Sequence, residues 1–323
     1  MLSYVVRPGD NLWSIVTSYG LHPTNKAVQK IINLNNLDST SYVITGTTLT
    51  IPLEGLYYIV QPGDNLWYIS RVFNVPIITL ASYNGLTSQG VIYPGTEIDF
   101  PKTSNGKFIN AGQYLICVDP GHQKTPNYEQ ELEGSCSNQT ADKVALGTQG
   151  VVTKKMEYEL NLEVALRLQH MLEQIGFKVL MIRTINDVNI SNSQRAFIAN
   201  NANADLCIHI HANDSTISDV NGIQVLYPPH ETPCITLDIS KKSKALAQYL
   251  LNEMVKYMGA NSHGLVADVD ITVFQWSKIP TALVEIGFMS NYQEDIKLSN
   301  AEYQNKLALG MVIGIEDYLI NID

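Results

Sequence analysis

The chain has 323 residues, 45% of them apolar and 16% charged, and a formal net charge of −10 at pH 7. A chain of this size can bury more than one hydrophobic core, whereas its acidic balance argues against nucleic acid, whose phosphates require a basic surface. It contains no run of about 18 apolar residues of the kind that crosses a membrane. We therefore expect neither nucleic acid nor a membrane as a partner.

An internal repeat occupies the first third of the chain. The sequence VRPGDNLW at 6–13 returns as VQPGDNLW at 60–67, an offset of 54, and the Asn-x-Leu at 35–37 returns at 84–86, an offset of 49. The first copy therefore has five extra residues between its two predicted helices. Each copy contains a strand, a Pro-Gly turn with a capping Asp or Asn, two helices and a closing strand. We predict a β-α-α-β unit for each copy.

The repeat resembles LysM, a small module that binds peptidoglycan and chitin, over residues 3–53 and 57–102. We accordingly predict two LysM domains, at 1–53 and 54–103. In that family the glycan groove lies between the turn after the first strand and the segment after the second helix. The resemblance implies glycan binding by Gly9, Asp10, Asn11, Leu12, Asn35 and Leu37 in the first copy, and by Gly63, Asp64, Asn65, Leu66, Asn84 and Leu86 in the second.

Two pairs of residues in the repeat also have a purely structural interpretation. Asp10 and Asp64 are alternatively helix caps with no part in binding. Trp13 and Trp67 are predicted to lie in the cores of the two modules.

A short polar segment at 102–107 is the predicted linker to a third domain, at 104–323. There the pattern changes to alternating strands and helices. We predict strands at 114–118, 177–182, 206–211, 223–227 and 281–286, and helices at 157–175, 195–202, 243–258 and 302–319. This alternation predicts an α/β fold with a mixed, largely parallel sheet and helices on both faces.

The four cysteines, Cys117, Cys136, Cys207 and Cys234, show no CxxC spacing. Two of them lie in apolar segments that read as strands, where a small thiol behaves as a buried hydrophobe. The sequence therefore favours buried free thiols over disulfides, which fits synthesis in the cytosol. The start of the chain also lacks the basic and apolar segments of a signal peptide.

Three short patches place His or Glu at the ends of predicted strands. They are DPGH at 119–122, IHIHAN at 208–213 and VEIGFMSN at 284–291. Because the strands of an α/β sheet deliver side chains to a common cleft, the patches indicate a metal hydrolase. A hydrolytic zinc site commonly uses two His and one carboxylate, a set that His122, His211 and Glu157 supply.

With Glu157 at the head of a predicted helix, these patches resemble the zinc-dependent N-acetylmuramoyl-L-alanine amidases of the amidase 3 family, over residues 114–320. The resemblance implies that His122, Glu157 and His211 bind Zn²⁺. It also implies that Glu285 is the catalytic glutamate, which accepts a proton from an activated water.

Four neighbouring features have open interpretations. Glu159 is an alternative carboxylate ligand. His209 is interpreted as packing, or as support behind the metal, at a position where the family usually has a small residue. Asp119 either orients His122 or caps the turn. The long polar loop at 124–155 is expected to wall the substrate groove.

The two resemblances together imply a peptidoglycan hydrolase that cleaves the amide between N-acetylmuramic acid and L-alanine of the stem peptide. Its LysM modules would anchor it to the wall glycan. Two alternatives are a zinc peptidase that cuts within the stem or cross-link, and a non-catalytic wall-binding protein. Without a signal peptide, we expect synthesis in the cytoplasm and action on the wall after release by a holin or by cell lysis. This pattern favours a phage endolysin over a sporulation or autolytic amidase.

Overall fold

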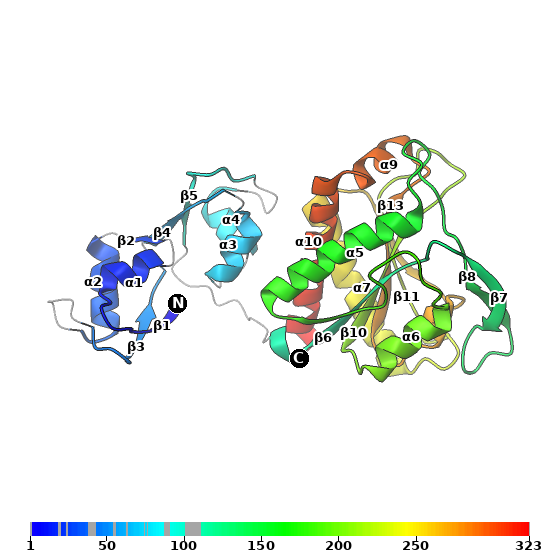
Figure 1. Cartoon of the computed structure of the whole chain (residues 1–323), viewed down its shortest axis with the longest axis horizontal. Coiled ribbons are helices and arrows are strands. Elements are labelled where there is room, and N and C mark those ends of the chain that lie inside the picture. The colour runs from blue at the N-terminus through cyan, green and yellow to red at the C-terminus, as the bar shows by residue number, and fades with distance from the viewer. Residues whose placement is uncertain are drawn as a thin grey trace. The chain divides into compact units, whose positions relative to one another are not determined.

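The computed structural model describes most of the chain and divides it into two compact units, Met1–Phe108 and Ile109–Asp323 (Figure 1). The described residues are 2–18, 21–23, 25–37, 43–53, 56–62, 64–73, 75, 77–86, 91–100 and 111–322. The predicted linker at 102–107 lies outside them, so the domain boundary at 103 stays a prediction. No helix in the described part of the chain is long and apolar enough to span a membrane.

The first unit contains the two copies of the repeat, each with the predicted β-α-α-β order. The first copy consists of β1 (Leu2–Val5), α1 (Leu12–Ser18), α2 (Asn25–Leu34) and β3 (Thr48–Ile51). The second consists of β4 (Leu56–Ile59), α3 (Leu66–Val72), α4 (Ile77–Tyr83) and β5 (Glu97–Asp99). The first and last strands of each copy pair antiparallel.

A strand that the repeat pattern did not predict joins the two copies. The segment between the helices of the first copy, which is the longer of the two, forms β2 (Leu21–Pro23). This strand pairs antiparallel with β4, so the sheet of the second copy has the order β2-β4-β5. His22 of β2 stacks on Tyr57 of β4, with ring centroids 5.2 Å apart. The first copy therefore supplies an edge strand to the second.

The two motif tryptophans differ in burial. Trp67 is 4% exposed, as predicted, but Trp13 is 45% exposed, so its predicted core position is wrong. Both follow a fully or almost fully buried leucine, Leu12 or Leu66, at the start of a helix. The two helices therefore bury the same leucine position, although the tryptophan that follows it differs in exposure between the copies.

The second unit has a six-stranded sheet of order β12-β11-β13-β10-β6-β9. Its strands are β6 (Leu115–Pro120), β9 (Lys178–Met181), β10 (Leu206–Asn213), β11 (Ile223–Tyr227), β12 (Ser262–Ala267) and β13 (Thr281–Phe288). All neighbours pair parallel except β11 and β13, which pair antiparallel. The predicted mixed, largely parallel sheet is confirmed, although β12 was not predicted.

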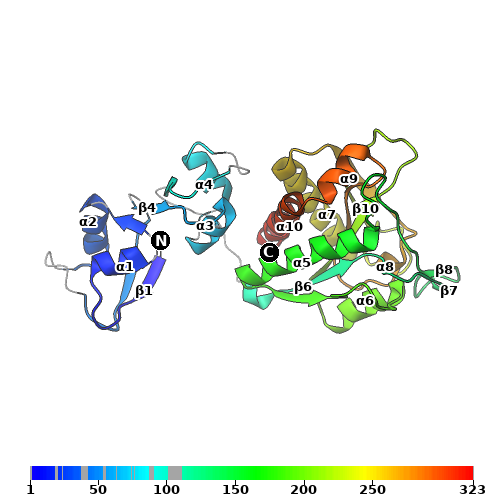
Figure 2. The same cartoon turned by 45° about the horizontal axis from the view of Figure 1, so that its top comes forward.

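Helices cover both faces of this sheet, as predicted. They are α5 (Glu157–Ile175), α6 (Asn192–Asn201), α7 (Leu237–Met258), α8 (Thr272–Gln275), α9 (Tyr292–Leu298) and α10 (Ala301–Ile322). Figure 2 shows α5 and α6 on opposite sides of β6, with α10 packed against both α5 and α7. A Cβ on Gly314 of α10 would lie 2.8 Å from Cα of Leu250 on α7. Glycine therefore allows these two helices to pack backbone against backbone.

The predicted loop at 124–155 contains a β-hairpin, formed by β7 (Asn127–Leu132) and β8 (Thr140–Val144). At its tip, Cys136 forms a disulfide with Cys234, 98 positions later in the chain. The prediction of free thiols is therefore wrong for this pair, because sequence spacing carries no information about a contact that the fold creates. Cys117 and Cys207 are buried and free, as predicted.

Candidate active site

The three patches of the sequence meet at the carboxyl edge of the parallel strands. His211 of β10 is the register partner of Glu285 of β13, so the two side chains emerge on the same face of the sheet. His122 directly follows the turn at the end of β6, the other neighbour of β10. Its φ of 58° places it in the left-handed region, which turns the chain sharply after the strand.

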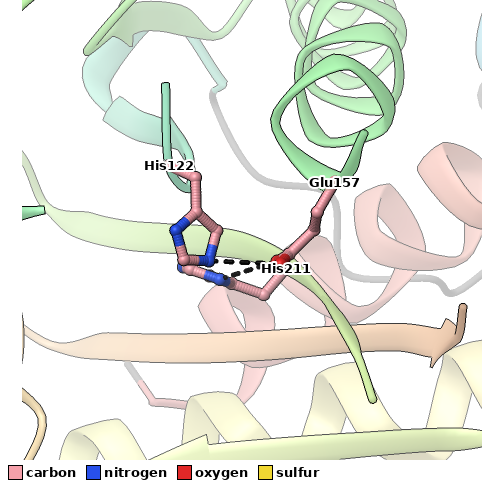
Figure 3. A group of neighbouring side chains, drawn as sticks. All are labelled: His122, Glu157 and His211. Atoms are coloured by element: carbon pink, nitrogen blue, oxygen red, sulfur yellow. Dashed lines mark hydrogen bonds and ion pairs between the residues drawn. The ribbon is translucent and has the colours of Figure 1, made fainter. Parts of the chain in front are cut away.

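Glu157 joins the two histidines from the first position of α5 (Figure 3). Its Oε2 lies 3.2 Å from Nε2 of His122, and its Oε1 lies 3.1 Å from Nδ1 of His211. One donor atom from each of the three residues lies within 4.8 Å of the other two. The structure thus brings together the three ligands that the sequence predicted.

Three further donors fix the Glu157 carboxylate. Oε1 accepts hydrogen bonds from the Ala212 backbone N–H at 3.1 Å and from Asn161 Nδ2 at 3.2 Å, and Oε2 accepts one from the Thr148 backbone N–H at 2.9 Å. Burial alone would raise the pKa of Glu157, but the hydrogen bonds and charges of the two histidines hold it well below its usual value. Glu157 is therefore ionised. The alternative ligand, Glu159, instead accepts a hydrogen bond from the Met156 backbone N–H.

The ring of His122 is oriented from the other side by the chain that leaves the hairpin. Its Nδ1 lies 2.8 Å from the carbonyl oxygen of Ala145. A carbonyl only accepts, so Nδ1 donates to it, and Nε2 is the ring nitrogen that faces Glu157. Burial opposes protonation of His122, yet the hydrogen bond and charge of Glu157 raise its pKa. Burial lowers the pKa of His211.

This donor set and its surroundings fit a zinc ion. Two imidazole nitrogens and one carboxylate oxygen are the ligands of many hydrolytic zinc sites, which keep a further position open. Two glycines, Gly121 and Gly147, leave space for the ligand side chains. A Cβ on Gly121 would overlap the ring of His211, and a Cβ on Gly147 would lie 2.5 Å from Oε2 of Glu157.

Glu285 differs from the three clustered residues in its hydrogen bonding and in its pKa. Its Oε2 is buried and has no hydrogen-bond partner among the described residues. Burial, together with the negative charge of Glu157, raises the pKa of Glu285 to about 8. A carboxyl with a pKa near neutrality can take up and release a proton, which is what a general base and acid must do. The catalytic role of Glu285 stays a prediction.

Asp119 has neither of its two predicted roles. Its carboxylate accepts hydrogen bonds from Arg195 at 2.6 Å and from Nδ1 of His209 at 2.8 Å. Burial would raise the pKa of Asp119, but the adjacent guanidinium of Arg195 outweighs it and lowers that pKa. Nε2 of His209 lies 2.8 Å from Oγ1 of Thr281, so His209 is held by hydrogen bonds behind the cluster, in line with its predicted supporting role.

Two buried arginines hold the turn that carries His122. Arg195 donates to the carbonyl oxygens of Pro120 and His122, each at 2.9 Å. Arg183 donates to the carbonyl oxygens of Pro120 at 2.9 Å and Gly121 at 3.0 Å. The sequence analysis assigned no role to these arginines, because only the fold shows that they converge on one turn.

The polar residues predicted to bind glycan in the first unit are largely occupied by the backbone. Asp10 accepts a hydrogen bond from the Arg7 N–H at 2.7 Å, and Asn11 caps α1 by accepting one from the Ser14 N–H at 2.9 Å. In the second copy, Asp64 and Asn65 make the same contacts with the N–H groups of Gln61 and Tyr68. The side chains of Leu12 and Leu66 are buried.

The paired asparagines link a helix to a strand in each copy. Asn35 donates to the carbonyl oxygens of Ile31 and Thr50 and accepts from the Thr50 N–H at 2.7 Å. Asn84 makes the corresponding bonds to Leu80 and Asp99. The remaining predicted glycan-binding residues are Gly9, which is exposed, Leu37 and Leu86, which are half-buried, and Gly63, which lies outside the described residues.

Comparison with known proteins identifies the families of both units. The family model described as N-acetylmuramoyl-L-alanine amidase matches residues 116–317, and the LysM domain model matches residues 4–52 and 58–101. The chain belongs to the N-acetylmuramoyl-L-alanine amidase family and carries two LysM domains.

Two relatives show how far the similarity extends. The chain is 31% identical to "N-acetylmuramoyl-L-alanine amidase LytC" of Bacillus subtilis over 163 residues, which cover 50% of this chain and 31% of that protein. It is 25% identical to "Probable cell wall amidase LytH" of Staphylococcus aureus over 297 residues, which cover 89% of this chain and 87% of that protein. The match thus spans about a third of LytC but most of LytH.

Solved structures share the fold of the second unit. An N-acetylmuramoyl-L-alanine amidase from Clostridium difficile 630 is 31% identical, with a TM-score of 0.53 over 65% of this chain and 98% of that one. The amidase Ami1 from Mycobacterium smegmatis has a TM-score of 0.60 over 65% of this chain and 99% of that one. At 23% identity, this second match supports the fold alone.

Proposed function

We propose that the protein is a zinc-dependent peptidoglycan hydrolase that cleaves the amide between N-acetylmuramic acid and L-alanine of the stem peptide. The observation that carries the proposal is the site itself. A His122–Glu157–His211 cluster lies beside Glu285, a carboxyl with an unpaired buried oxygen, in a chain of the amidase family. This combination supplies both a metal-ligand set and a proton acceptor.

The three clustered residues would hold the zinc ion. A bound Zn²⁺ polarises a carbonyl oxygen and lowers the pKa of water, which makes hydrolysis of an amide possible near neutral pH. The Ala145 carbonyl and the Thr148 N–H keep His122 and Glu157 in position, and so limit the rearrangement needed for binding.

Glu285 would move the proton. As water adds to the amide carbon, Oε2 of Glu285 accepts a proton from it. The same carboxyl then returns the proton to the leaving nitrogen of L-alanine, so the C–N bond breaks and a free amine departs. The pKa of about 8 belongs to the metal-free site, and the positive charge of a bound ion would lower it toward the ionised form that accepts a proton.

The two LysM domains would retain the enzyme on its polymeric substrate. Binding modules linked to a catalytic unit raise the effective concentration of that unit at the surface they bind. We also propose the wall as the place of action. The Cys136–Cys234 disulfide fits an oxidising environment, although release by a holin or by cell lysis stays a prediction.

The test is mass spectrometry of purified peptidoglycan digested by the protein, with and without a chelator. We expect free stem peptides that begin with L-alanine, and intact glycan strands. Product formation should be lost on chelation and restored by Zn²⁺. Shortened or uncross-linked peptides would instead identify a zinc peptidase. The absence of product from several wall types would favour a wall-binding protein without activity.

A further inference from the structure

A cavity of about 350 Å³ opens beside the metal-ligand cluster. Its lining includes His122 and His211, but it also includes the segment between β12 and α8 and the first residues of α8. The proposed hydrolysis uses only the histidine part. A cavity of this size is large enough for a small ligand group, so the rest of its lining is available for recognition.

One part of the lining is apolar. Ile271, Val273 and Leu283 all contribute to it, and Val273 and Leu283 are each 6% exposed. These side chains come from the connection to α8, from α8 itself and from β13. An apolar wall of this kind takes up methylene groups in preference to charged or strongly hydrated groups.

A second part of the lining is the guanidinium group of Arg195. Arg195 is 1% exposed, and its terminal nitrogens donate to Asp119, Pro120 and His122. Because the adjacent carboxylate of Asp119 neutralises the guanidinium charge, this part of the lining does not repel a cation.

The third part of the lining is a carboxylate. Asp270 lines the cavity and is exposed, and its backbone N–H donates to Oδ1 of Asp268 at 2.8 Å. In the described part of the chain, neither aspartate has an ion-pair partner within 4.0 Å. This side of the cavity therefore has a negative charge without an ion-pair partner among the described residues, and it attracts a cation.

Resting on the proposed function, we propose that the cavity binds the diamino-acid residue of the stem peptide and that Asp270 recognises its side-chain ammonium. The methylenes of that residue pack on Ile271, Val273 and Leu283. An alkyl chain that ends in an ammonium matches an apolar wall that ends in a carboxylate. The acidic residue of a stem peptide would be repelled at the same place.

The experiment compares two soluble muropeptides that differ only in the diamino-acid side chain, whose amine is either free or N-acetylated. The full-length protein, loaded with zinc, should cleave the free-amine substrate with a kcat/KM about fivefold higher, the range of an exposed ion pair. Asp270→Asn should reduce this preference to less than about twofold. Succinylation gives the side chain of the diamino acid a negative charge. The Asp270→Lys variant should therefore cleave a succinylated substrate with a higher kcat/KM than the free-amine substrate.

The control is Asp219→Asn, which removes an exposed carboxylate that does not line the cavity and should keep the wild-type preference. Equal cleavage of both substrates by the wild type, or an Asp270→Asn variant with an undiminished preference, would overturn the proposal while leaving the amidase function intact.

If neither substrate is cleaved, a binding measurement tests recognition by the cavity separately from the proposed hydrolysis. Titration calorimetry with the free stem tripeptide, with and without the N-acetyl group, needs no hydrolysis. Tighter binding of the free-amine form that is lost in Asp270→Asn would support the cavity as its site. Equal binding of the two forms, or a preference that Asp270→Asn retains, would overturn it.

Discussion

The two units differ in whether the polar groups of their motif residues have hydrogen-bond partners. In the LysM unit, the polar groups of Asp10, Asn35 and Asn84 are occupied by hydrogen bonds to the backbone. In the amidase unit, Glu285 keeps a buried oxygen without a partner, and Arg195 keeps an unused N–H. The repeated polar residues of the LysM unit therefore maintain its fold, whereas the unpartnered oxygen of Glu285, beside the metal-ligand cluster, is available to accept a proton.

The largest expected effect comes from removing the unpaired carboxyl. Glu285→Gln keeps the size of the side chain but cannot accept a proton, so we expect hydrolysis to fall about a thousandfold. Zinc content, measured by mass spectrometry, and pelleting with purified walls should stay at wild-type levels. Glu231→Gln, which changes an exposed carboxylate, is the matched control. Near-normal hydrolysis by Glu285→Gln would show that Glu285 is not the proton acceptor.

Removing the Cys136–Cys234 disulfide tests whether the attached hairpin stabilises the amidase unit and supports its hydrolysis. Replacing both Cys136 and Cys234 with serine should cost about 2–4 kcal/mol of unfolding free energy, because the crosslink restricts the unfolded chain. Hydrolysis should also fall, because the hairpin leads directly to Ala145 and Thr148, which orient two of the ligands. Urea unfolding, with and without a reductant, measures the first effect. The wild type under reducing conditions should match the double variant, and a variant as stable as the oxidised wild type would contradict the expectation.

Replacing Asn35 tests whether this motif asparagine maintains the fold of the LysM unit or binds glycan directly. Asn35→Ala removes three side-chain hydrogen bonds, two to Thr50 of β3 and one to Ile31 of α2. We expect the LysM unit to lose about 2 kcal/mol of stability while the hydrolysis of soluble muropeptides stays unchanged. Asn33→Ala, at an exposed position of the same helix, should change stability by less than about 0.5 kcal/mol. Thermal unfolding followed by circular dichroism measures both. A loss of glycan binding by Asn35→Ala at full stability would instead indicate direct contact.

A further expected effect is a pH dependence of stability in the zinc-free protein. The pKa of Glu285 is raised from 4.5 to about 8, so the folded state holds a proton there that the unfolded state has released. Its contribution to stability is full below pH 4.5 and is lost as the pH rises through about 8. The stability of Glu285→Gln relative to the wild type should therefore increase over this range, by about 1.4 kcal/mol for each unit of pKa difference and so by several kcal/mol in all. Unfolding curves at several pH values with a chelator present would measure it, and a constant difference would contradict the raised pKa.

Several features of the site could be predicted from the sequence because they depend on residue type at strand ends. Apolar runs predicted β6, β10 and β13, and the His and Glu residues beside those runs are the ones that converge. The starts of α6 and α7 were predicted less accurately from the sequence. Ser191 and Thr236 begin these helices, which start several residues earlier than the apolar pattern indicated, because a cap depends on one side-chain hydrogen bond and not on periodicity.

The sequence alone determined the LysM repeats, the α/β alternation and the residue types of the metal-ligand set, because local periodicity and motif spacing depend on near neighbours in the chain. Only the tertiary structure decided the Cys136–Cys234 disulfide, the exposure of Trp13 and the partners of Asp119. These features depend on contacts between segments that are distant in sequence, and their geometry is fixed only when the sheets, helices and hairpin pack together.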